Sequence, residues 1–214
     1  SSDVCSSDLN ALSVSTGQNN FAAGCQALKC NTAGNYNIAL GQGTLYGNIT
    51  GGCNTAIGVG GLAALKTGCD NIAIGANALS SQISSYGNIA LGKSAASGLT
   101  TGYANIFLGH RVANSGTITG TYNNAQGYSA LATLTSGNHN LAFGYASMTQ
   151  GCTGSDNIGL GQFTLAKGNG NMNIAIGSCS MCNNTSGSCN IAMGYAAIDR
   201  KSTRLNSSHT DISR

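Results

Sequence analysis

Chemistry in this 214-residue chain would have to begin with its cysteines. The strongest metal-binding pattern is Cys179-Ser-Met-Cys182, with Cys189 close behind, because a C-x-x-C pair can hold zinc through two thiolates. A structural zinc site needs four ligands, however, and no fourth ligand is evident near these three. We therefore favour disulfides or free thiols here and expect neither a metal nor another cofactor.

Histidines and acidic residues offer little for hydrolysis. His110 and His139 fall at different positions of the repeat described below, and Asp70 and Asp156 are expected to lie far from them in that repeat. A catalytic triad needs all its members within hydrogen-bonding reach, so we predict that the chain is not an enzyme. Calcium-binding solenoid repeats need Asp in every coil, which excludes calcium by that route.

Tyrosines are the remaining residues with binding potential. They lie just before or just after the predicted strands, and exposed rings there could stack on sugars, although packing at a corner is the simpler interpretation. The tyrosines in question are Tyr36, Tyr86, Tyr103, Tyr122, Tyr128, Tyr145 and Tyr195.

The two ends of the chain differ from its middle. Residues 1–9 read SSDVCSSDL and residues 199–214 read DRKSTRLNSSHTDISR. With suitable codons, DNA encoding 199–207 is the reverse complement of DNA encoding 1–9, which is typical of translated sequencing adapter. We therefore expect 10–198 to be the native part, a metagenomic fragment of a longer protein, and 199–214 to be disordered.

Charge and hydropathy narrow the function classes. Between the two ends, five basic residues stand against Asp70 and Asp156, which is too sparse for a stripe that neutralises phosphates. No apolar run reaches the roughly 18 residues that a membrane span needs. Nucleic-acid binding and membrane insertion of this fragment are not expected. The eight cysteines outside residues 1–9 form an even number, which suggests disulfides of undetermined pairing.

A repeat of 17 residues dominates the middle. Its clearest copies read Asn-Ile-Ala-Ile-Gly, at 71–75 and 173–177, and eleven copies follow one another with one 18-residue and one 16-residue spacing. Such a fixed short period predicts an all-β fold, a parallel β-solenoid or β-roll of about eleven 17-residue coils.

Two positions of the repeat are nearly invariant and are read as structural. We expect the leading Asn to form a ladder of side-chain amides along the stack and the Gly four residues later to form a corner. The positions assigned to this role are Asn37, Gly41, Asn54, Gly58, Asn71, Gly75, Asn88, Gly92, Asn140, Gly144, Asn173, Gly177, Asn190 and Gly194. A second Gly, three residues before each Asn, marks another corner in all copies but one, where Ser85 replaces it.

Period-two alternation after each Asn predicts one short strand per coil. An apolar residue eight positions after the Asn, from Leu28 to Ile198, is expected to anchor the return side as a second strand or a short helical turn. The strand carries Ile or Leu on one face and Ala on the other. We expect one face to fill the coil and the other to pack against sister chains.

The unit G-x-x-N-x-A-x-G-x-x-A-L, seen from Gly68 to Leu79, resembles repeats of phage tail fibres and related bacterial surface fibres. It is also similar to the heads of YadA-like trimeric autotransporter adhesins. The resemblance covers about residues 17–198 and implies an extracellular homotrimer, on a virion or a cell surface, that serves as a shaft or as a head for cell adhesion. A host receptor or glycan is the implied partner. Copies centred on Phe107, on Asn124 with Gln126, and on Gly159 depart from the pattern.

An ice-binding or other surface-binding solenoid is the alternative function. Flat, weakly charged solenoids with rows of Thr can bind ice, and the residue before the second Gly is usually Thr or Ser. That column is single, and Ala33 and Asn169 interrupt it. The fibre is therefore the preferred hypothesis.

Overall fold

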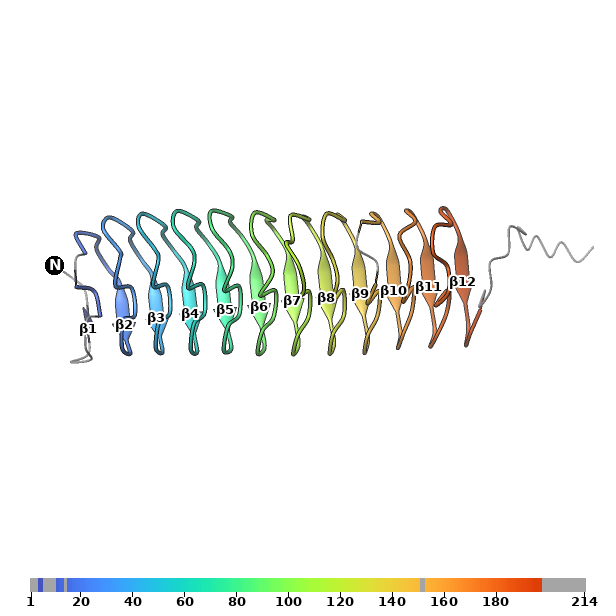
Figure 1. Ribbon diagram of the computed structural model, residues 1–214, viewed down its shortest axis with the longest axis horizontal. Helices are drawn as coiled ribbons and strands as arrows, with labels where there is room; N and C mark the ends of the chain where they lie inside the picture. Colours follow the sequence, from blue (N-terminus) through green and yellow to red (C-terminus); the bar gives the residue numbers. More distant parts are fainter. Residues whose placement is uncertain (1–3, 6–10, 14, 151–152, 198–214) are drawn as a thin grey trace, which may run out of the picture.

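The chain folds into a rod of stacked coils in a computed structural model that describes residues 4–5, 11–13, 15–150 and 153–197. Each coil contributes one strand to a single parallel sheet that runs the length of the rod (Figure 1). The predicted all-β parallel β-solenoid is confirmed. In chain order the strands are β1 (Val4–Cys5), β2 (Phe21–Ala23), β3 (Ile38–Leu40), β4 (Thr55–Ile57), β5 (Ile72–Ile74), β6 (Ile89–Leu91), β7 (Ile106–Leu108), β8 (Asn124–Gln126), β9 (Leu141–Phe143), β10 (Ile158–Leu160), β11 (Ile174–Ile176) and β12 (Ile191–Met193).

The register of the sheet follows the 17-residue period. Ile72 of β5 pairs with Ile89 of β6, for example, and the centres of the two strands, Ala73 and Ala90, pair as well. The longer spacing falls between β7 and β8 and the shorter one between β10 and β11, and both pairs keep full register. The extra and missing residues are therefore absorbed outside the strands.

The Ala face of each strand fills the coil, and the Ile and Leu face is turned outward. Ala73 is fully buried, whereas its neighbours Ile72 and Ile74 are 36% and 40% exposed. Across the coil, the buried Ala row meets the apolar residue eight positions after the Asn, such as Leu62 or Leu79. The core is consequently a thin layer of Ala against Leu, because a coil this short encloses little volume.

The predicted Asn ladder is present along the rod. In each of ten successive pairs, the Nδ2 of one Asn donates to the Oδ1 of the Asn one coil earlier, at 3.0 to 3.3 Å. Asn54 is typical: its backbone N also donates to Asn37 Oδ1, and its Nδ2 to the carbonyl of Gly68. Buried amides whose hydrogen bonds are satisfied hold each coil to both of its neighbours.

The two glycine corners have different physical causes. Gly75, four residues after its Asn, has φ +131°, and a Cβ there would lie 2.5 Å from the carbonyl oxygen of Gly92. Gly102, from the other column, needs no positive φ, but its Cβ would lie 2.2 Å from the carbonyl oxygen of Gly120. The first column therefore combines conformation with close approach, and the second is set by close approach alone.

The return side of the coil is neither a regular second strand nor a helical turn, which corrects the expectation from the sequence. Its residues form turns, and backbone hydrogen bonds still join neighbouring coils, as from Leu45 N to Gly61 O at 2.9 Å and from Gly47 N to Ala63 O at 3.0 Å. The residue eight after the Asn adopts a left-handed conformation, such as φ 50° at Leu62, which no regular strand or right-handed helix permits. Ile198, also assigned to this column, lies outside the described residues.

Left-handed residues recur at three positions of the repeat, and none of them is β-branched. These positions are the residue before the Asn, the sixth after it and the eighth after it. Val, Ile and Thr are common elsewhere in the chain but absent from these columns among the described residues. A branched Cβ clashes with the backbone at positive φ, which explains the exclusion.

We expect Leu62→Ile to destabilise the chain by about 1 to 2 kcal/mol more than Leu62→Met does. Both replacements keep a buried side chain of similar volume, and Met already occupies the same column at Met148 and Met181. Only Ile places a branched Cβ at φ 50°. Urea unfolding followed by circular dichroism measures the difference, and equal stabilities for the two variants would contradict this account.

Two departures from the repeat are compensated inside the core. Phe107 replaces the central Ala of β7 and is fully buried, and the column opposite holds Ala96 and Ala113 there in place of Leu. Gly159, the centre of β10, faces a Ser147–Thr164 hydroxyl pair at 2.7 Å, and its carbonyl accepts from Ser147 Oγ at 3.1 Å. Each odd residue thus matches an odd residue across the coil.

Most of the two atypical ends lies outside the described residues. Val4 and Cys5 are the exception, since they pair with Phe21 and Ala22 as a short parallel strand at the start of the sheet. That residues 1–9 and 199–214 are translated adapter stays a prediction.

Candidate functional site

A chemically uniform surface of the rod is the outward side of the sheet, which we call the outer face. It consists of the first and third residues of strands β2 to β12, none of which is charged. In most strands these are Ile, Leu, Phe or Met, half-buried by their neighbours or exposed. Aliphatic side chains stacked at the strand spacing make a flat apolar stripe along the axis.

One strand interrupts this stripe with two amides. Asn124 and Gln126 of β8 stand where the neighbouring strand β7 has Ile106 and Leu108, and they pair in full register with it. Asn124 is half-buried and Gln126 exposed. Among the described residues of the outer face, Thr55 is the only other polar side chain. The sequence marks β8 as irregular, but the orientation of its amides required the structure.

Aromatic rings line up along the rod before the strands. Tyr86 and Tyr103 stack with centroids 4.9 Å apart, Tyr122 meets Tyr103 edge-on at 5.4 Å, and His139 stacks on Tyr122 at 5.2 Å. Tyr103 also raises the pKa of Tyr122, chiefly through charge repulsion.

A second aromatic row follows the strands. His110 meets Tyr128 edge-on, Tyr128 stacks on Tyr145, and Tyr145 meets Phe163 edge-on, each pair at 5.4 Å. In both rows a ring contacts the ring of the next coil, so ring faces are engaged along the axis. Sugars stack on free ring faces, and these rows offer few of them between their ends.

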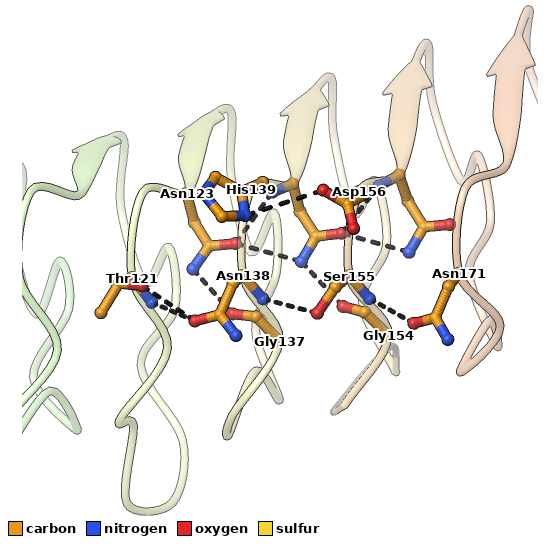
Figure 2. Close-up of polar contacts among 11 residues, drawn as sticks. Thr121, Asn123, Gly137, Asn138, His139, Gly154, Ser155, Asp156 and Asn171 are labelled. Atoms are coloured by element: carbon orange, nitrogen blue, oxygen red, sulfur yellow. Dashed lines mark hydrogen bonds and ion pairs between the residues drawn. The ribbon is translucent and has the colours of Figure 1, made fainter.

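His139 and Asp156 lie side by side, which overturns the expectation that the acidic residue would be remote. They occupy the same position in adjacent coils, and His139 Nδ1 is 3.6 Å from Asp156 Oδ1 (Figure 2). Both side chains are more than half exposed. The other neighbour of His139 in this row is the ring of Tyr122, which stacks on it. An exposed pair of this kind contributes little to stability because water and salt screen it.

A polar ladder that was not predicted from the repeat runs beside this pair. Thr121 N donates to Asn138 Oδ1 at 2.8 Å, Asn138 N to Ser155 Oγ at 3.0 Å, and Ser155 N to Asn171 Oδ1 at 2.8 Å (Figure 2). Short polar side chains thus accept backbone hydrogen bonds from the preceding coil. Their spacing of 16 or 17 residues was the available signal.

The described cysteines occupy several different positions of the repeat. Cys25, Cys30, Cys53, Cys69 and Cys189 are thiols in the structure, so the disulfides that the even count suggested are not formed among them. Burial and then the neighbouring Asp70 raise the pKa of Cys69, which disfavours its nucleophilic thiolate. Cys152 lies outside the described residues.

The C-x-x-C segment forms a turn, with Cys182 N donating to Cys179 O at 3.3 Å. Within the described ranges, no three His, Cys, Asp or Glu residues come together in a way that could hold a metal ion. Over the same ranges no helix is long and apolar enough to cross a membrane.

Comparisons of the chain with protein families, with curated proteins and with solved structures found no match. The inference of function therefore depends on the rod and its outer face.

Proposed function

We propose that this chain is a structural or adhesive segment of an extracellular fibre, a phage tail fibre or a bacterial surface adhesin, and that it assembles through its outer face as a homotrimer. The observation that carries the proposal is the uncharged aliphatic stripe of β2 to β12 along a straight rod. The resemblance of the repeat to fibre proteins supports the extracellular setting and the three-fold state.

The size of the outer face supports assembly. Ten steps of about 4.8 Å between strands, each strand about 10 Å long, give the outer face a flat area of roughly 500 Å². Monomeric proteins rarely expose contiguous apolar patches larger than a few hundred Å². A standard interface covers about 800 Å² on each partner. The outer face approaches this area, and because each added coil enlarges it, the strength of the assembly grows with the number of coils.

The chemistry of the same face argues for a fibre over an ice-binding surface. Ice-binding solenoids present hydroxyls in register, whereas the outer face presents Ile and Leu, with Thr55 as its only hydroxyl among the described residues. Exposed Thr50, Thr67 and Thr101 lie in a single column at the corner before the strand. Aliphatic stripes favour protein contacts.

Sedimentation of the full chain tests the proposal. We expect a species of three times the 21.3 kDa chain mass, and we expect Ile74→Arg to reduce it to monomers by placing a charge on the outer face. Asn77→Arg is the matched control, because Asn77 is exposed, lies off the face, and has Arg111 at the same position of another coil. Circular dichroism checks that both variants keep the fold. A wild-type chain that stays monomeric at about 100 μM would contradict the proposal.

A further inference from the structure

We infer that Asn124 and Gln126 of β8 fix the axial register in which copies of this chain pack against one another through the outer face. This inference rests on the proposed assembly and adds how sister chains are aligned. Its starting observation is that two amides stand on a face that is otherwise almost entirely aliphatic.

A ladder of identical rungs has no intrinsic register. Most strands of the outer face present a similar pair of aliphatic side chains, and successive strands repeat at about 4.8 Å. Two such faces would fit nearly as well after sliding by one coil, because Ile and Leu pairs meet again. Only a rung of different chemistry makes one alignment better than its neighbours.

The partner most compatible with this face is a second copy of the same chain. A surface that matches the rungs over the whole rod must have the same axial period, and an identical rod has it. The face also carries no charge that would repel a copy. Parallel alignment in register overlaps all eleven strands and places β8 against β8. An antiparallel copy matched at β8 would leave β2 and β3 uncovered.

The amides discriminate because they have no hydrogen-bond partner in the part of the chain that the structure describes. Neither side chain hydrogen-bonds to another described residue, so both depend on water or on a neighbouring molecule. In register, the amides of sister chains meet and can donate and accept among themselves. Slipped by one coil, they face Ile106 with Leu108, or Leu141 with Phe143, and lose water without gaining a hydrogen bond. A buried Asn fixes register in coiled coils for the same reason.

Photo-crosslinking reads the register directly. A benzophenone amino acid in place of Ile74 projects from β5, and mixing ¹⁵N-labelled with unlabelled full-length chains identifies links between chains by mass spectrometry. We expect links to residues 72–74 of the sister chain to exceed those to 55–57 or 89–91 by about tenfold or more. In the Asn124→Ile/Gln126→Leu variant, the links should spread over all three strands while sedimentation still reports the assembly.

The control is Gln162→Leu, which makes a similar chemical change at an exposed turn outside the face and should keep the wild-type pattern. Wild-type links spread over neighbouring strands would overturn the register inference and leave the assembly standing. The register inference would also be overturned if the Asn124→Ile/Gln126→Leu variant kept its links confined to residues 72–74. Monomers in sedimentation, with no links between chains, would overturn the assembly and the register together.

Discussion

Phe107→Ala is expected to lower the free energy of unfolding by about 3 to 5 kcal/mol, the usual cost of removing a large buried aromatic side chain. Phe107 is fully buried at the centre of β7, and Ala96 and Ala113 hold the column across the coil where other coils have Leu. With the ring removed, three small side chains would surround an empty space. Urea unfolding monitored by circular dichroism measures the loss.

At the same site, Ala113→Leu should have opposite effects on stability in the wild-type chain and in the Phe107→Ala variant. Ala113→Leu alone should destabilise the chain by about 1 to 3 kcal/mol, because the ring of Phe107 already fills that volume. Combined with Phe107→Ala, it restores the Ala-against-Leu pattern of the other coils and should recover part of the loss. A double-mutant cycle gives the coupling. If the two effects simply add, the two residues do not compensate each other.

Gly75→Ala should also have a large effect: we expect it to lower the free energy of unfolding by about 4 kcal/mol or more. Alanine at φ +131° is strained in any surroundings, at about 1 to 3 kcal/mol. Its Cβ would also lie 2.5 Å from the carbonyl oxygen of Gly92, in the backbone of the next coil, which cannot move aside without breaking the ladder.

Gly194→Ala separates the two contributions. Gly194 has a similar φ of +122°, but no described atom lies within 4 Å of the position its Cβ would take. This variant should therefore carry only the conformational strain. We expect its Tm in thermal unfolding to be well above the Tm of Gly75→Ala. Equal losses would mean that stacking of the coils contributes nothing at this corner.

Much of the fold could be read from the sequence because the repeat reports the coil directly. A strict Asn and Gly at a fixed spacing require a backbone that returns to the same place every 17 residues, and the ladder of Asn54 and its equivalents does so. The side of the strand that points inward could not be read, since both sides are apolar. The size of the coil decides it: a coil this short accepts Ala73 but has no room for Ile72 and Ile74 inside.

The return side and the candidate site needed the structure for a different reason. Leu62 was recognised as an anchor, but hydrophobicity says nothing about φ. Among the described residues, the absence of β-branched side chains from its column was the signal that predicts a left-handed turn. His139 and Asp156 are 17 residues apart, so aligning the coils would have placed them together. The residues of the outer face could not be predicted from the sequence, because that requires knowing that the Ala side of each strand points into the coil.

Stacked coils joined by hydrogen bonds along the axis also give the rod a particular response to tension. A pull on its two ends loads the interfaces between coils in series, so the weakest interface opens first and the others keep their geometry. Each coil released from the stack exchanges about 4.8 Å of rod for as much as about 60 Å of extended 17-residue chain. The rod would therefore lengthen in discrete steps and absorb work while its remaining coils stay folded.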